Sequence, residues 1–260
     1  MARTELHPAT AAARAGAPAR LTVGLAATAV ALQLAYPLSN GATRLRLSVV
    51  IVAVFAAAVA AHAIGTRGWR VGGAALGVVA GLGFAAEVVG VHRGVPFGHY
   101  AYGAGLGPRL AGVPVVVGLA WTMLAWPAAL VARRLARRPA TRVAVGAWAL
   151  AAWDLYLDPQ LVAAGGWRWR DPDPHLPGEP DVPLTNYAGW LLVATAVSVA
   201  LQWLLRHDRG GPDLAPLALY LWTWLGSAVA LAMFLDRPGA AAWGAAGMGL
   251  VAVPLLRRLR

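Results

Sequence analysis

Long apolar runs separated by short polar segments dominate the sequence. Eight runs have the length and the near absence of charge that are typical of helices crossing a hydrocarbon layer about 30 Å thick. They cover residues 21–38, 45–65, 69–91, 110–132, 143–157, 187–205, 214–235 and 240–256. We therefore predict an all-α fold, a polytopic transmembrane bundle of about seven to eight spans, with residues 21–260 as one domain and residues 1–20 as a disordered cytoplasmic tail.

Composition supports a membrane protein. Hydrophobic residues make up 59% of the 260 residues and charged residues only 13%, well below the roughly 25% of soluble domains. The chain has no cysteine, so neither a disulfide framework nor thiolate metal ligands are available. The formal net charge of +11 comes from 22 basic residues that border the apolar runs. This distribution indicates membrane topology, and we expect no nucleic-acid partner.

The arginines also predict an orientation. The segment ARRLARRPATR, residues 132–142, concentrates five of them between two apolar runs. A cytoplasmic N-terminus places this segment and most other arginines inside, as the positive-inside rule requires. We therefore expect a multi-pass protein of the cell membrane, surrounded by membrane lipid, with its N-terminus in the cytoplasm. Gly73, Gly77 and Gly81 recur at a spacing that predicts close helix packing.

Three acidic residues lie within or at the end of apolar runs. Glu87 is near the end of the third run, and Asp154 and Asp158 are near the end of the fifth. These runs cross the membrane in the same direction, so all three acids reach a similar depth, beneath the two long loops 92–114 and 158–186. An acid at membrane depth costs about 3 kcal/mol or more and therefore marks a functional site by default.

Asp154 and Asp158 are four residues apart, on one face of a helix. Two carboxylates so close repel each other, so one is expected to keep its proton at neutral pH. A neutral carboxyl group beside an ionised one can perform general acid–base catalysis. We take Asp154, Glu87 and Asp158 as candidate catalytic residues.

Each acid also has a purely structural explanation. Asp158 precedes Pro159 and could simply end a helix. The acids could also pair with neighbouring basic residues, namely Arg168, Arg170, His92 and Arg93. We favour a site because all three acids lie beneath the same two loops.

Aromatic residues gather at the same end of the predicted bundle. An interfacial aromatic belt explains several of them, but a belt should populate both membrane faces. The candidate substrate-binding residues are Tyr100, Tyr102, Trp153, Tyr156, Trp167, Trp169, Asn186 and Trp190. His92 and His99 are close in sequence, yet no HxxxH or HxxE spacing accompanies them, so we expect no metal site.

Several motifs, taken together, resemble one known family. They are EVVGVHRGVPFGHYAY (87–102), VPVVVGLAW (113–121), DLYLDP (154–159), GWRW (166–169) and PLTNYAGW (183–190). Their order and spacing are similar to those of the carotenoid biosynthesis membrane proteins, which include carotenoid hydratases of the bisanhydrobacterioruberin and gamma-carotene type. The resemblance covers roughly residues 40–235.

The resemblance implies a cofactor-free enzyme that adds water to the terminal isopropylidene double bond of a linear carotenoid. Asp154 would protonate the alkene, and Asp158 or Glu87 would activate the water. Trp153, Tyr156, Trp167 and Trp169 would stabilise the carbocation, and Asn186 would hold the water.

Two other classes stay open at this stage. A membrane prenyltransferase could bind magnesium diphosphate through the acids of DLYLD, residues 154–158. A non-catalytic carotenoid-binding or transport protein could use intramembrane acids as a relay.

Overall fold

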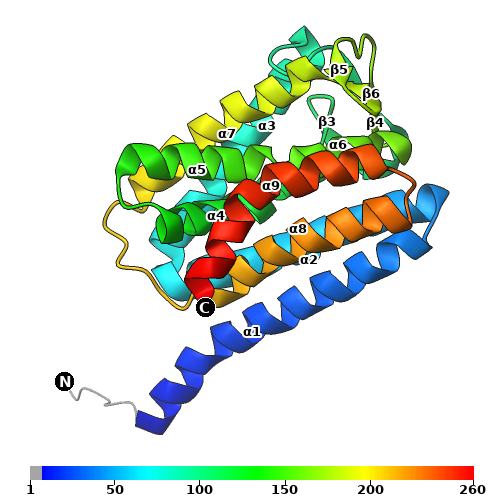
Figure 1. Cartoon of the computed structure of the whole chain (residues 1–260). Coiled ribbons are helices and arrows are strands. Elements are labelled where there is room, and N and C mark those ends of the chain that lie inside the picture. Colours follow the sequence, from blue (N-terminus) through cyan, green and yellow to red (C-terminus); the bar gives the residue numbers. More distant parts are fainter. Residues whose placement is uncertain (1–7) are drawn as a thin grey trace.

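The computed structural model describes residues 8–260, which form an almost entirely helical bundle (Figure 1). The α-helices of this part of the chain are α1 (Pro8–Ala35), α2 (Gly41–Gly68), α3 (Ala74–Arg93), α4 (Val116–Leu135), α5 (Pro139–Ala151), α6 (Asp154–Ala163), α7 (Leu184–Leu204), α8 (Leu214–Met233) and α9 (Pro238–Leu259). Short turns η1 (Tyr36–Leu38), η2 (Trp69–Gly73) and η3 (Ala104–Leu106) connect some of them.

Six helical stretches among the described residues are long and apolar enough to cross a membrane. The second, Gly41–Arg93, has 53 residues, which at 1.5 Å per residue is far too long for one span. The chain turns at Gly68, whose φ of 74° suits glycine, and Gly72 then lies directly against the backbone of Ala63. This stretch therefore contains two helices, α2 and α3, each of which can cross the membrane once. The predicted all-α transmembrane bundle is confirmed.

The predicted fifth span, residues 143–157, is not one helix. It is divided between α5 and α6, with a turn at Ala152 and Trp153. An acidic side chain is favourable in the first turn of a helix, and Asp154 occupies that position in α6. Pro159 lies inside α6, which continues to Ala163, so the idea that Asp158 ends a helix is wrong.

The connections between helices separate into two ends of the bundle (Figure 1). The α2–α3, α4–α5 and α7–α8 connections lie at one end, which we call the arginine-rich end. The long loops after α3 and after α6 lie together at the other, which we call the loop end. The prediction that both loops share one side is confirmed.

Six short strands fold the two long loops onto each other. They are β1 (Tyr100–Tyr102), β2 (Arg109–Leu110), β3 (Val113–Pro114), β4 (Trp167–Trp169), β5 (His175–Leu176) and β6 (Glu179–Pro183). The β2–β3 and β5–β6 pairs are local hairpins, whereas β1 pairs antiparallel with β4 from the other loop. Backbone hydrogen bonds from Gly103 to Gly166 and from Arg170 to His99 extend this pairing on both sides.

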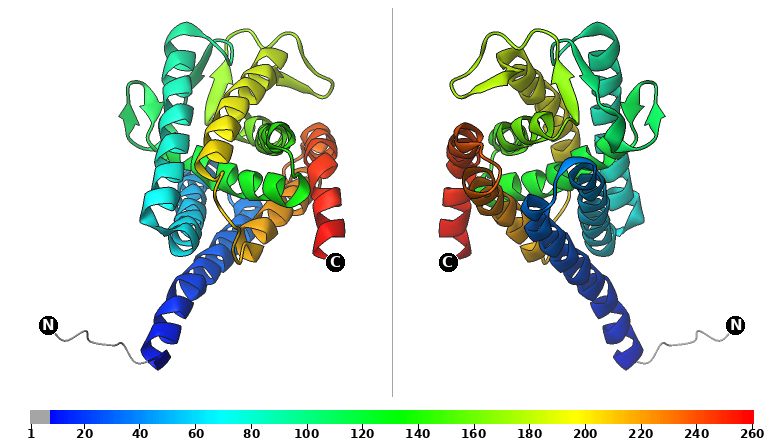
Figure 2. Two further views of the ribbon diagram at one scale, coloured as in Figure 1. Left: turned by 90° about the vertical axis from the view of Figure 1, so that its left-hand side faces the viewer. Right: turned by 90° about the vertical axis from the view of Figure 1, so that its right-hand side faces the viewer.

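Two sequence predictions differ from the structure. Residues 1–7 of the expected tail lie outside the described residues, while residues 8–20 belong to α1, because their alanine-rich sequence has high helix propensity. Figure 2 shows this N-terminal part of α1 extending away from the other helices. The packing predicted for Gly73, Gly77 and Gly81 is wrong, since no neighbouring atom would meet a Cβ at any of them. Gly83 and Gly90 are the glycines of α3 that pack closely, Gly83 against the ring of Trp121 and Gly90 against Phe97 and Tyr100.

Candidate active site

An apolar cavity of about 540 Å³ extends into the bundle beneath the loop end. Helices α1, α2, α4, α6 and α8 supply most of its wall, and the β1 and β4 strands contribute their aromatic side chains. Glu87, Asp158, Asn186 and Thr223 are buried polar side chains of this wall, each at most 6% exposed. The cavity therefore offers a hydrocarbon-like space with carboxyl groups on its wall.

Asn186 connects the two aspartates. It lies in the first turn of α7, opposite the start of α6, and its side-chain amide donates a 2.8 Å hydrogen bond to Oδ2 of Asp154. The same nitrogen donates a second hydrogen bond to Oδ2 of Asp158. Asp158 lines the cavity, whereas Asp154 is fully buried and does not. Both aspartates are thus held in place, but only Asp158 can touch a molecule in the cavity.

Glu87 occupies a separate position in the wall and is surrounded by donors. Its Oε2 accepts hydrogen bonds from the hydroxyl groups of Tyr100 and Tyr102, the latter at 2.8 Å, and its Oε1 accepts one from the indole nitrogen of Trp121 at 3.3 Å. Burial, together with the nearby Glu87, raises the pKa of both tyrosines well above the ordinary value. Both hydroxyl groups therefore remain protonated donors, an arrangement that suits an ionised carboxylate.

The β1–β4 pairing explains why Trp167 and Trp169 are separated by a single residue, Arg168. Side chains alternate between the two faces of a strand, so Tyr-Ala-Tyr and Trp-Arg-Trp each present two aromatic rings on one face. Tyr100 is paired with Trp169, and Tyr102 with Trp167; the ring centroids of each pair are 5.7 Å apart. All four rings line the cavity. The ladder therefore forms an aromatic wall beside Glu87.

Three further tryptophans complete this wall, Trp121 from α4, Trp190 from α7 and Trp153 from the turn between α5 and α6. The rings of Trp121 and Trp190 are stacked, with centroids 4.2 Å apart and planes inclined by 16°. Trp153 meets Trp190 edge-on at 6.1 Å. Stacked and edge-to-face rings hold one another in fixed orientation, and electron-rich ring faces stabilise positive charge.

The cavity opens between α1 and α8. Leu34 on α1, with Leu225 and Val229 on α8, belong to its wall and are also more than half exposed on the outer surface. A 2.7 Å hydrogen bond from the indole of Trp222 to Gln33 Oε1 joins the two helices across this mouth. Since both helices are among the candidate membrane spans, the mouth faces the region that lipid would occupy.

The structure brings together all the predicted binding residues. The cavity wall includes Tyr100, Tyr102, Trp153, Tyr156, Trp167, Trp169, Asn186 and Trp190. The ion pairs expected as a structural explanation of the acids are wrong, because Glu87, Asp154 and Asp158 form no ion pair with any basic residue of the described chain. Direct delivery of a proton by Asp154 does not fit its position behind Asp158.

Sequence reasoning missed Trp121, although it ends the motif VPVVVGLAW (113–121). It also missed the cavity mouth, because no motif distinguishes Gln33 or Trp222. Among residues 8–260 no group of three or more His, Asp or Glu side chains is placed to hold a metal ion.

The sequence matches the family of carotenoid biosynthesis proteins over residues 47–255. It is 36% identical over 147 residues to a bisanhydrobacterioruberin hydratase of Haloarcula japonica, which corresponds to 55% of this chain and 48% of that protein. The chain thus spans about half the length of this relative. No solved structure matches the chain.

Proposed function

The chain belongs to the carotenoid biosynthesis protein family, and we propose that it is a carotenoid hydratase. The reaction is the addition of water to the terminal isopropylidene double bond of a linear carotenoid. The observation that carries this proposal is an apolar cavity whose wall holds buried carboxyl groups without any basic partner among residues 8–260. The name of the Haloarcula relative supports the same reaction class.

The cavity suits one end of a long hydrocarbon. A carotenoid is about as long as the hydrocarbon core is thick, roughly 30 Å, so a cavity of about 540 Å³ takes the end group and leaves the polyene outside. In this proposal the substrate passes sideways from the lipid through the mouth between α1 and α8. Its terminal double bond then meets the aromatic wall and the carboxyl groups.

Asp158 is the proposed proton donor. It lines the cavity, and its neighbour Asp154 is close enough to share the amide of Asn186. Two adjacent carboxyl groups retain a proton more readily than one. Transfer of that proton to the less substituted alkene carbon leaves a tertiary carbocation. Asp154 then acts as a positioning residue that supports Asp158.

Glu87 is the proposed base. Its three hydrogen-bond donors favour the ionised form, and a carboxylate beside the carbocation stabilises its charge. Water attacks the tertiary carbon while Glu87 accepts a proton from that water. The stacked Trp121 and Trp190 rings contribute cation–π stabilisation of about 0.5–2 kcal/mol. Proton exchange with water restores Asp158 and Glu87.

Expression in a host that accumulates a linear carotenoid tests the proposal. We expect a new pigment whose mass exceeds that of the precursor by one water, and no such pigment from an Asp158→Asn variant. Asp181→Asn is the matched control, because Asp181 is exposed and outside the cavity. Unchanged carotenoid co-purifying with the protein, without any new pigment, would support a binding or transport protein instead.

We also propose the cell membrane as the location, with the arginine-rich end in the cytoplasm. The five arginines of residues 132–142 lie at that end, in agreement with the positive-inside rule.

A further inference from the structure

A second pocket lies at the arginine-rich end, away from the proposed active site. Its volume is about 600 Å³, and α4, α5, the α7–α8 connection and the ends of α8 and α9 form it. Four arginines line it, namely Arg133, Arg134, Arg142 and Arg209. Two carboxylates, Asp208 and Asp213, are also part of the wall. Nothing in the proposed hydration reaction uses these residues.

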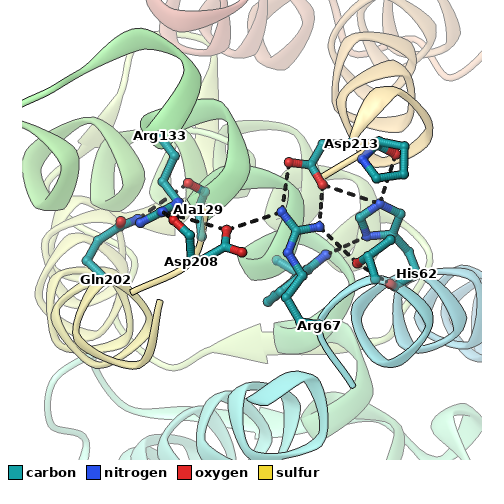
Figure 3. Close-up of polar contacts among 10 residues, drawn as sticks. His62, Arg67, Ala129, Arg133, Gln202, Asp208 and Asp213 are labelled. Atoms are coloured by element: carbon teal, nitrogen blue, oxygen red, sulfur yellow. Dashed lines mark hydrogen bonds and ion pairs between the residues drawn. The ribbon is translucent and has the colours of Figure 1, made fainter. Parts of the chain in front are cut away.

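Both carboxylates are already engaged by a buried arginine from α2 (Figure 3). The two terminal nitrogens of Arg67 donate to Asp213, one of them at 2.8 Å, and one also reaches Asp208 at 3.3 Å. The Arg67 side chain is only 3% exposed. His62 Nε2 lies 3.5 Å from Asp213 on its other side. Arg67 therefore uses the negative charge that could have balanced the arginines of the pocket.

Arg133 is incompletely paired. Its Nη2 donates to the backbone carbonyl of Asp208 at 2.7 Å and lies 3.6 Å from that carboxylate. Its Nη1 is buried and has no hydrogen-bond partner in the described part of the chain. An unpaired buried donor on a charged group is costly. Counting Arg67, five arginines face two aspartates here, which leaves a net charge of +3.

The apolar part of the pocket wall indicates which kind of anion would bind beside the arginines. Leu130, Leu214, Leu217 and Leu259 line the pocket beside the arginines, and Leu214 is 68% exposed on the outer surface. A free anion gains nothing from leucines, whereas a lipid places its phosphate beside its own acyl chains. The pocket also lies at the ends of membrane-spanning helices, where lipid head groups are found.

We propose that this pocket binds the phosphate group of an anionic membrane lipid. Arg133 and Arg142 donate to the phosphate oxygens, as guanidinium groups do in charge-assisted pairs, and Arg209 closes the pocket from the α7–α8 connection. The acyl chains lie along Leu214 and Leu217. This site is independent of the proposed hydration reaction.

Thermal unfolding of the purified full chain in detergent tests the site. The probes are dioctanoyl phosphatidylglycerol, dioctanoyl phosphatidylcholine and inorganic phosphate, each titrated separately. The test variant combines Arg142→Gln with Arg209→Gln, which leaves the buried Arg67 and the partly buried Arg133 intact. The matched control combines Arg137→Gln with Arg138→Gln, because both residues are exposed, lie between α4 and α5 and are absent from the pocket wall.

Phosphatidylglycerol should raise the melting temperature of the wild type and of the control variant. In the test variant the concentration needed for half of that rise should increase about tenfold or more, since two favourable charges are lost. An equal rise with phosphatidylcholine, or an unchanged response of the test variant, would overturn the proposal. An equal rise with inorganic phosphate would overturn the assignment to a lipid.

Discussion

The side-chain amide of Asn186 donates a 2.8 Å hydrogen bond to the carboxylate of Asp154, joining the first turn of α7 to the first turn of α6. The same amide reaches Asp158 on the cavity wall. One neutral donor thus connects two buried acids that no basic residue of the described chain neutralises. The position of Asp158, and therefore of the proposed proton donor, depends on this contact.

Replacing Asn186 with alanine should impair both stability and hydration. The change leaves two buried carboxyl groups without their shared donor, which costs about 1–3 kcal/mol, and releases Asp158 from its position. We expect a lower melting temperature and a decrease of about tenfold or more in hydrated pigment. Asn40→Ala is the control, because Asn40 is exposed and its side chain makes no capping hydrogen bond. Equal effects of both changes would contradict this role.

Glu87→Gln should reduce hydration by about a hundredfold, the order of magnitude of a lost general base. The amide keeps the shape of the side chain but cannot accept the proton of the attacking water. Tyr102→Phe should have a milder effect, since Tyr100 and Trp121 still donate to Glu87. Initial rates at saturating substrate measure both effects.

Tyr187→Phe serves as the control for these hydroxyl deletions. The Tyr187 hydroxyl is buried, has no hydrogen-bond partner among the described residues and is absent from the cavity wall. We expect its removal to leave the rate unchanged. If it slowed hydration as much as Glu87→Gln does, general disturbance of the fold would explain both results.

The stacked pair of Trp121 and Trp190 should affect kcat for hydration more than the affinity for the carotenoid. Trp190→Leu removes a ring face that stabilises the carbocation, so we expect kcat to fall by about tenfold. Trp190→Phe should keep part of the activity, because phenylalanine retains a weaker π face. Trp203→Leu, on the same helix but 61% exposed, should behave as the wild type. The role is contradicted if leucine and phenylalanine at 190 give the same kcat.

The cavity mouth can be narrowed at Gly226. A Cβ at this position would lie 3.1 Å from the Trp222 ring, which bridges to Gln33 on α1. Gly226→Leu should therefore slow hydration of a full-length carotenoid while leaving a short isoprenoid with the same end group nearly unaffected. Gly77→Leu is the control, because nothing lies within 4 Å of a Cβ there. Equal slowing of both substrates would show that the mouth is not the entry route.

The sequence predicted features that depend on hydrophobicity and chain order alone. Long uncharged runs indicated the spans, and alternation of direction placed the two long loops on one side. These two predictions were sufficient to place Glu87 and Asp158 at a similar depth in the membrane. The aromatic residues of both loops were therefore expected to lie together, and in the structure they line one cavity.

Features that depend on tertiary contacts could not be predicted. Neither glycine nor proline marks the turn at Ala152 and Trp153, and the β1–β4 ladder joins residues from two distant loops. Asp154 and Asp158 share a helical face, so spacing could not show which one reaches the cavity. The glycine spacing predicted the wrong packing face of α3. A side chain at Gly83 would collide with Trp121, whereas one at Gly77 would meet nothing, and only the tertiary structure shows this difference.

Isotope incorporation tests the central claim most directly. Membranes that contain the protein are incubated with a linear carotenoid in water enriched in oxygen-18, and the pigments are analysed by mass spectrometry. We predict a product that carries one heavy oxygen at its terminal tertiary carbon, formed by the wild type and by Asp181→Asn but not by Asp158→Asn. A product that lacks the heavy oxygen, or one that Asp158→Asn forms at the wild-type rate, would contradict the account.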